Sequence, residues 1–268
     1  MLSLMADTVL YHVTESLATI TLNRPEAMNA LDVRTKEALR DALRTAATES
    51  AVRAVLLTGS GRAFCVGQDL KEHIGILRNT TPDTPSMNTV VEHYNPITEA
   101  ITEMRKPVLA AVNGAAAGAG FGFALAADYR LVAESASFHT SFAQVGLGAD
   151  SGLSWTLPRV VGPGTAADLL LFPRSVDAAE ALRLGIAQRV VPDDELASAA
   201  QELGRRLAEG PTLAYAAIKD ALAYGATHTL PESLAHEAEL QQRAGASADH
   251  RAAVTAFVAK ERPRFRGN

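Results

Sequence analysis

Hydrophobic positions near the start of the chain fall into two short strand-like runs and one helical run. Residues 9–11 and 18–22 are rich in β-branched and aromatic side chains, with a turn at 14–16 between them, which is typical of a hairpin. Asp32 can cap a following helix, whose apolar positions recur at helical spacing to about Glu49. The pattern therefore predicts a β-hairpin followed by a surface helix.

Three compact apolar runs come next and alternate with helical stretches. They cover residues 54–58, 107–112 and 129–133, and each run ends in a turn of small or polar residues. Apolar runs of this length that end in such turns are typical of buried strands. Because crossover connections join strands that alternate with helices, we predict an α/β core.

After about residue 177 the pattern becomes helical. Helices are predicted over residues 177–184, 194–208, 211–224, 231–245 and 248–260. No clean linker precedes them, so we treat the C-terminal third as a helical subdomain. Between Glu72 and Asn95, threonine and proline residues instead predict a mobile loop, and loops of this length often act as lids.

Length and cysteine content limit the class of protein to which the chain can belong. The 268 residues suffice for one large domain with a substantial core. The single cysteine, Cys65, cannot form an intramolecular disulfide, and no Cys/His cluster has metal-ligand spacing, so we predict no metal site. Asp7 and His12 interrupt the first apolar positions, and the longest apolar stretch, 115–127, is shorter than the roughly 20 residues of a spanning helix. We expect a cytoplasmic protein with no membrane partner.

The formal net charge of −5 argues against a broad nucleic-acid-binding face. The C-terminal run nevertheless places one acid, Glu261, among four bases: Lys260, Arg262, Arg264 and Arg266. This run fits a solvated tail and a local phosphate contact about equally well.

Two glycine-rich segments follow predicted strands, residues 61–70 and 113–122. Small residues let the backbone approach a ligand closely, so that main-chain N–H groups can point at an oxygen. A helix that begins in the second segment would present free N–H groups and a favourable dipole to negative charge. Each segment alone also fits an ordinary tight turn, and neither matches a dinucleotide-binding fingerprint.

Taken together, the two segments resemble the signatures of the crotonase, or enoyl-CoA hydratase/isomerase, superfamily. The matching motifs read AFCVGQDL at residues 63–70 and NGAAAGAG at 113–120, and the likeness extends over about 18–265. It implies a fold of repeated ββα units in residues 1–200 and a helical trimerisation subdomain in 201–268, in a homotrimer or a dimer of trimers. It also implies that the backbone N–H groups of Gln68 and Ala119 form an oxyanion hole for an acyl-CoA thioester.

The resemblance also identifies where this chain departs from a hydratase. The two glutamates by which hydratases of the family activate water map to Gly122 and Phe142, and neither residue can transfer a proton. Asp150 supplies a carboxylate nearby, in a stretch that resembles ring-1,2-epoxyphenylacetyl-CoA isomerases, where this aspartate is the acid/base. If it is buried among apolar neighbours, its pKa should be raised. Asp150 or Ser151 could instead cap the next helix, and covalent chemistry stays open.

Contacts to coenzyme A follow from the resemblance as well, and no cofactor beyond the coenzyme A moiety is expected. The predicted binding residues are Ala27, Met28, Ala63, Val66, Asp69, Leu70 and Phe142, with Phe257 and Lys260 reaching a neighbouring subunit's coenzyme A. Asp69 is expected to fix its loop by accepting backbone N–H bonds. His93 and His139 are expected to be structural, and Trp155 to line the pocket or the core.

The favoured function is therefore an isomerase that stabilises a thioester enolate, in fatty acid or phenylacetate catabolism. An enoyl-CoA hydratase and a catalytically silent acyl-CoA-binding protein are the alternatives. RNA binding, a third class, lacks support from a basic stripe.

Overall fold

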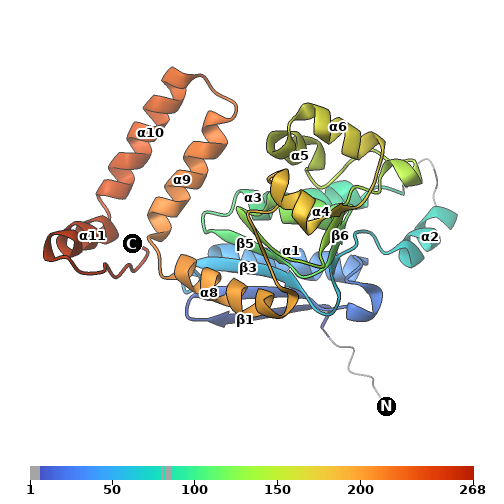
Figure 1. Cartoon of the computed structure of the whole chain (residues 1–268), viewed down its shortest axis with the longest axis horizontal. Coiled ribbons are helices and arrows are strands. Elements are labelled where there is room, and N and C mark those ends of the chain that lie inside the picture. The colour runs from blue at the N-terminus through green and yellow to red at the C-terminus, as the bar shows by residue number, and fades with distance from the viewer. Residues whose placement is uncertain (1–6, 80, 82–85) are drawn as a thin grey trace, which may run out of the picture.

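Two β-sheets form the framework of the molecule in the computed structural model, which describes residues 7–79, 81 and 86–268 (Figure 1). Within these residues the large sheet has the strand order β1-β2-β3-β5-β7-β10, and the small sheet has the order β4-β6-β8-β9. The strands of the large sheet are β1 (Val9–Thr14), β2 (Leu17–Leu22), β3 (Ala54–Gly59), β5 (Val108–Val112), β7 (Tyr129–Ala133) and β10 (Arg189–Val191). Those of the small sheet are β4 (Ala63–Cys65), β6 (Ala115–Ala117), β8 (Ser137–His139) and β9 (Val176–Asp177).

Helices and single helical turns connect and cover the sheets. The α-helices are α1 (Val33–Thr48), α2 (Leu70–Arg78), α3 (Asn95–Thr102), α4 (Ala119–Ala126), α5 (Leu153–Val161), α6 (Pro163–Leu171), α7 (Ala178–Arg183), α8 (Leu196–Ala208), α9 (Thr212–Gly225), α10 (Leu230–Gly245) and α11 (Ala248–Ala259). The shorter turns are η1 (Pro25–Ala27), η2 (Val90–Tyr94), η3 (Ala143–Val145) and η4 (Asp193–Glu195).

A strand–strand–helix unit repeats along the core. In β3-β4-α2 and again in β5-β6-α4, the first strand joins the large sheet and the second joins the small sheet. Strands β7 and β8 follow the same rule before α5. The predicted α/β fold of repeated ββα units is therefore confirmed.

The apolar runs account for this arrangement. Strands β3, β5 and β7 pair in parallel, and every residue of β5 is buried, as expected of a sheet that is covered on both faces. Strands β1 and β2 form the predicted antiparallel hairpin. Helix α1 begins where Asp32 accepts a hydrogen bond from the Thr35 N–H at 2.8 Å, and it buries Leu39 and Leu43 against the core.

The structure corrects three sequence-based expectations. The segment from Glu72 to Asn95 is not one long loop, because α2 and η2 occupy both of its ends; residues 80 and 82–85, between them, lie outside the described part. The helical half also contains the short strands β9 and β10, which periodicity cannot detect at two or three residues. The segments 61–70 and 113–122 contain strands β4 and β6 as well as turns.

Helices α9, α10 and α11 form an arm that stands away from the sheets (Figure 1). The predicted boundary at residues 200/201 falls inside α8, which packs against β3, β5 and β7, so the arm itself begins at α9. Arg53 holds the base of the arm, donating to the Thr212 hydroxyl at 3.0 Å and to the Phe265 carbonyl at 2.9 Å. Large apolar side chains remain exposed on the arm: Ile218, Leu222, Leu230, Leu234, Val254, Phe257 and Val258.

Candidate active site

The first predicted oxyanion donor, the N–H of Gln68, belongs to the connection between β4 and α2. Leu31 donates to the Gly67 carbonyl at 2.8 Å and accepts from the Asp69 N–H at 3.1 Å, so Gln68 forms a parallel bridge with Leu31. Because successive N–H groups of an extended chain point to opposite sides, the Gln68 N–H points away from Leu31.

The second predicted donor, the N–H of Ala119, lies close to Gly67. Ala119 is the first residue of α4, where N–H groups have no acceptor within the helix and the helix dipole favours negative charge. A Cβ added to Gly67 would lie 3.4 Å from the Ala119 nitrogen, which shows how closely the two segments approach. Gly118 precedes the helix at φ 52° and ψ −123°, a conformation that only glycine adopts readily. The two segments that carry the predicted donors therefore lie against each other.

Two asparagine amides anchor the first glycine-rich segment, and one of them, Asn113, joins it to the second segment. The Asn113 amide donates to the carbonyls of Gly61 at 2.9 Å and Ala63 at 3.1 Å. The Asn29 amide, fully buried, donates to the Ser60 carbonyl at 3.0 Å and to the same Ala63 carbonyl at 2.8 Å. The Ala63 carbonyl is thus an anchor of the loop that precedes Gln68. Buried amides of this kind preorganise a site because each lost bond would leave a donor unsatisfied.

Asp150 lies between β8 and α5 and is half-buried. Burial raises the pKa of its carboxyl above the ordinary value of 3.8, while a 2.8 Å hydrogen bond from the Ser151 hydroxyl opposes that shift. Neither Asp150 nor Ser151 caps α5, because Gly152 occupies the N-cap position and no side chain bonds there. The capping alternative is therefore wrong, and the expected rise in pKa is confirmed.

Gly122 explains how the Asp150 segment approaches the oxyanion donors. A Cβ at Gly122 would lie 2.5 Å from the Ser151 carbonyl oxygen and 2.6 Å from the Ser151 Cβ, closer than atoms can pack. Gly122 lies three residues after Ala119 on α4, so Ser151 packs about one helical turn from the second donor. Ser151 itself is 1% exposed and adopts φ 51°, a strained backbone for a residue with a side chain.

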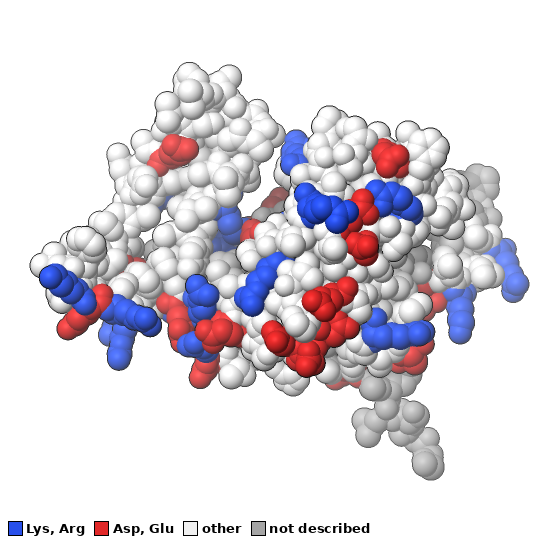
Figure 2. All heavy atoms as spheres, viewed as in Figure 1, with Lys and Arg blue, Asp and Glu red and all other residues white. Residues whose placement is uncertain are grey.

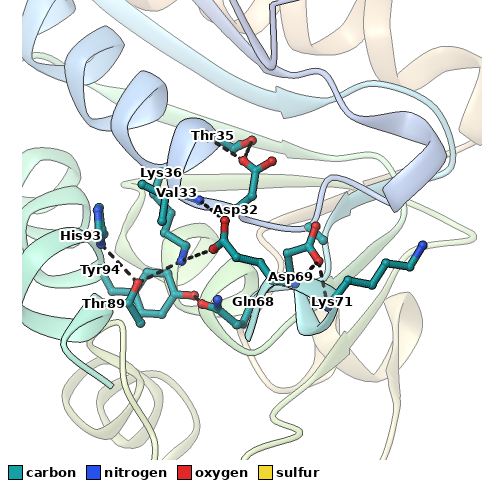
Figure 3. Close-up of polar contacts among 12 residues, drawn as sticks. Asp32, Val33, Thr35, Lys36, Gln68, Asp69, Lys71, Thr89, His93 and Tyr94 are labelled. Atoms are coloured by element: carbon teal, nitrogen blue, oxygen red, sulfur yellow. Dashed lines mark hydrogen bonds and ion pairs between the residues drawn. The ribbon is translucent and has the colours of Figure 1, made fainter. Parts of the chain in front are cut away.

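A buried polar network adjoins the first donor (Figure 3). The Tyr94 hydroxyl donates to the side-chain carbonyl of Gln68, and the Tyr94 ring lies under the Lys36 ammonium at 5.4 Å. Lys36 is fully buried, and its Nζ lies 3.0 Å from the Thr89 hydroxyl and 3.6 Å from Glu72 Oε1. Burial lowers the pKa of Lys36, while Glu72 opposes that shift. Through this network α1, α2 and η2 hold the Gln68 side chain.

Tyr94 also links the network to the acid. Burial raises the pKa of the Tyr94 hydroxyl, and the negative charge of Asp150 raises it further. The Asp150 charge therefore lies within electrostatic range of the Tyr94 hydroxyl. The ring packs edge-on against Phe123 of α4, with centroids 6.1 Å apart, and this contact fixes the position of the hydroxyl.

The remaining predicted residues of the first motif surround these donors. As expected, the Asp69 carboxylate accepts from backbone N–H groups, those of Lys71 at 3.0 Å and Glu72 at 3.3 Å, and it pairs with Arg24 at 3.0 Å. The pKa of Asp69 is lowered by its bonds to Arg24 and to these backbone groups, which together outweigh burial. Leu70 is 61% exposed at the start of α2. Asp69 therefore orients the loop.

Other predicted residues divide between the core and the surface. Phe142 is buried, and its ring lies 4.0 Å from where a Gly118 Cβ would be. Ala27 and Met28 are half-buried at η1, and Val66 is half-buried beside Gly67. Trp155 is 47% exposed under the Arg159 guanidinium, so the expectation that it lines the core is wrong.

The two predicted histidines have structural partners. His93 Nδ1 lies 3.2 Å from the Thr89 hydroxyl, and His139 Nδ1 lies 2.7 Å from the Ser141 hydroxyl. Cys65 is also unsuited to catalysis, because burial raises the pKa of its thiol to about 12.

Phe257 and Lys260 lie on the arm, far from the donors within one chain (Figure 1). Phe257 is 84% exposed, and Lys260 ends α11 in a left-handed conformation. One chain does not bring them to Gln68, Ala119 and Asp150.

Several residues that shape the site had no predicted role, namely Asn29, Lys36 and Tyr94, and Ser151 was predicted only as a possible helix cap. A Lys at the apolar face of a predicted amphipathic helix is one signal that was available for Lys36. The others depend on contacts across the chain, which no local pattern reveals.

Surface charge and hydropathy add two general findings. On the face drawn in Figure 2, basic and acidic side chains of the described residues are interspersed. No helix in residues 7–79, 81 and 86–268 is long and apolar enough to cross a membrane.

Comparisons with known proteins agree with this geometry. The model of the enoyl-CoA hydratase/isomerase family matches residues 12–268. The chain is 45% identical to a Rhodobacter capsulatus protein named "Probable enoyl-CoA hydratase", covering 97% of this chain and 98% of that one. It is 40% identical to the 1,2-epoxyphenylacetyl-CoA isomerase of Escherichia coli K12, covering 98% and 100%. A crystal structure of an enoyl-CoA hydratase from Bacillus anthracis superposes with a TM-score of 0.91 at 30% identity, covering 97% and 100%. The chain therefore belongs to the enoyl-CoA hydratase/isomerase family.

Proposed function

We propose that this protein is an acyl-CoA isomerase that relocates a proton on the acyl group, with Asp150 as the acid/base. The N–H groups of Gln68 and Ala119 hold the thioester oxygen as it becomes an enolate. A preorganised donor of this kind contributes roughly 3 kcal/mol to stabilising the transition state.

The observation that carries this proposal is the half-buried carboxyl of Asp150. Its pKa is raised by burial, which makes the group better suited to both taking and returning a proton. Gly122 and Phe142, where a hydratase has its glutamates, bring no second carboxylate to activate water. The packing of Ser151 on Gly122 leaves no space for a glutamate side chain there.

The proposed step conserves every atom of the substrate. The Asp150 carboxylate takes a proton from a carbon next to the thioester, and the electron pair of the broken C–H bond moves onto the thioester oxygen. When the enolate collapses, Asp150 returns the proton to another carbon of the conjugated acyl group, and the double bond moves. Nothing is oxidised, and no water is added.

We also place coenzyme A by analogy with the family. Ala27, Met28 and Val66 are half-buried beside the first motif, where a pantetheine chain would pass toward Gln68. Phe257 and Lys260 would contact the coenzyme A of a neighbouring subunit in a trimer, since they are exposed on the arm.

The C-terminal basic run supports the same placement. It borders a hollow of about 440 Å³, beside Phe257 and Lys260 in the sequence, that is lined by Arg251, Arg262 and Arg264 together with Glu261. Light scattering on the purified protein tests the assembly, and a monomeric mass would contradict the contact between subunits.

A hydratase is the second candidate, favoured by the name of the 45% identical relative. The two reactions differ in mass, because hydration adds one water and isomerisation adds nothing. The purified protein should be incubated with a 3-enoyl-CoA, with epoxyphenylacetyl-CoA and with crotonyl-CoA, followed by mass spectrometry. We expect an isomer of unchanged mass from one of the first two and no hydrated product from the third.

The role of Asp150 is tested by Asp150→Asn, with Asp41→Asn on the exposed face of α1 as the matched control. Asp150→Asn should still bind coenzyme A thioesters, and its turnover should fall by about 10³-fold, as for loss of a general acid/base. Unchanged turnover would sink the assignment. Binding of thioesters without any turnover by the wild type would instead identify a silent binding protein.

A further inference from the structure

Arg130 of β7 is a buried cation that forms no ion pair among the described residues. It is 5% exposed, and its guanidinium donates to the main-chain carbonyls of Ala127 at 2.7 Å and Ile186 at 2.6 Å. Burial lowers the pKa of Arg130 to about 10, and the charge of Asp128 opposes that shift. The Asp128 carboxylate itself pairs with Lys219, at 2.6 Å. Since a buried charge without an ion pair is costly, Arg130 calls for an explanation beyond packing.

The guanidinium lies at the C-terminal end of α4. Ala127 is the C-cap residue of this helix, and Ala119, whose N–H is the second predicted oxyanion donor, is its first residue. The C-terminal end of a helix carries about half a negative charge and the N-terminal end about half a positive charge. Arg130 therefore binds the negative end of the helix whose positive end carries the predicted donor.

The two ends of α4 are close enough for a charge at one end to act at the other. Eight residues span about 12 Å along a helix axis. All eight are buried, so water does not screen the charge along this path. At about 12 Å and an effective dielectric constant of about 20, one unit charge changes the stability of an anion by an amount worth roughly tenfold in rate.

We infer that Arg130 is a positioning residue for the oxyanion donor of Ala119 and acts on it through α4. Its hydrogen bonds fix the C-terminal end of the helix, and its charge cancels the negative end, which would otherwise repel an enolate at the N-terminal end. A bound thioester carries little charge on its oxygen, whereas the enolate carries a full charge, so the effect falls on kcat and not on binding. The inference rests on the proposed function.

The test compares Arg130→Lys with Arg130→Gln, which both keep a donor for the Ala127 carbonyl and differ in charge. With the thioester that the wild type isomerises, kcat at about pH 7 should be about tenfold lower in Arg130→Gln than in Arg130→Lys. KM should agree between the two variants within about twofold. Lys106→Gln is the matched control, because Lys106 Nζ donates to the carbonyls of Ala46 at 2.6 Å and Glu49 at 2.7 Å at the end of α1. This control should keep the wild-type kcat.

Arg130→Lys also allows the charge to be removed within one folded variant. A lysine in this buried place should lose its proton below its ordinary pKa of about 10.4, while its neutral amine can still donate a hydrogen bond. The ratio of kcat in Arg130→Lys to kcat in the wild type should therefore fall by about tenfold between about pH 7 and pH 9. A purely structural hydrogen bond would leave this ratio constant.

Equal kcat values in Arg130→Lys and Arg130→Gln would overturn the inference, as would a ratio that does not change with pH. A tenfold loss in Lys106→Gln would also overturn it, because the effect would then not depend on α4. If Arg130→Gln does not fold, the pH dependence of Arg130→Lys decides alone. A wild type that turns over no coenzyme A thioester would refute the proposed function itself, whereas an active wild type with equal variants would refute only the role of Arg130.

Discussion

The close packing of Gly122 against Ser151 makes a substitution on α4 a sharp test of the site. In Gly122→Ala the new Cβ would lie 2.5 Å from the Ser151 carbonyl oxygen and 3.2 Å from the Ser151 carbonyl carbon. These atoms are backbone, so no side chain can rotate away, and overpacking of this kind costs about 1–3 kcal/mol of the free energy of unfolding. Because Ser151 must move, Asp150 moves with it, and a displacement of that order lowers turnover by about 10²-fold.

The assay combines urea unfolding with turnover of the acyl-CoA substrate. Gly75→Ala is the matched control, since Gly75 is exposed in α2 and no atom lies within 4 Å of an added Cβ. The free energy of unfolding of this control variant should rise by about 0.5–1 kcal/mol, because alanine is a better helix former than glycine. Gly122→Glu should not hydrate crotonyl-CoA, because its side chain cannot enter without displacing Ser151. A Gly122→Ala variant with wild-type stability and turnover would refute the packing argument.

Three further predictions concern the charges of the site. The pKa of Asp150 is higher in the folded chain than in the unfolded chain, so the free energy of unfolding falls as the pH rises between these two pKa values. Asp150→Asn should therefore have a higher melting temperature than the wild type at about pH 7. The difference in melting temperature should vanish near the ordinary pKa of 3.8. Equal melting temperatures at both pH values would contradict this. Ser151→Ala removes the hydrogen bond that lowers the pKa of Asp150, so the acid limb of the profile of kcat/KM against pH should move to higher pH. Ser151→Gly also removes the hydroxyl but relaxes the strained backbone. If the hydroxyl is the cause, Ser151→Gly should move the acid limb by the same amount. Lys36→Met leaves the partly buried Glu72 without its cation and should lower the free energy of unfolding, measured by urea titration, by about 1–3 kcal/mol. Adding Glu72→Gln to the same chain should restore part of that free energy. No recovery in the double variant would argue against the ion pair.

Periodicity and composition predict the frame of this molecule well, because long buried strands and long amphipathic helices follow from local patterns. The hairpin, α1 and the arm helices lie within a few residues of their predicted ranges. The strands of the small sheet have two or three residues each and are held by pairing with distant segments, so no window of sequence identifies them. The 72–95 segment was misread because proline and threonine near its centre hid the helical ends.

The candidate site likewise contains some residues that local motifs predict and others that only the fold reveals. Gln68, Ala119 and Asp150 can be found from motifs, since their roles depend on backbone segments and a carboxylate at known places. The role of Gly122 as a contact surface for Ser151 depends on two segments about 30 residues apart, and only the fold brings them together. The same is true of Tyr94, whose hydroxyl meets Gln68 across 26 residues of chain.

The burial of α4 has a consequence for how activity is lost on heating. All eight residues of this helix are buried, so α4 should open only together with the core. The Gln68 amide instead adjoins α2, which buries none of its residues and opens more easily. The two proposed oxyanion donors therefore belong to parts of the protein with different local stability. Turnover should fail at a lower temperature than global unfolding, at the point where the Gln68 segment loosens while Ala119 is still in place.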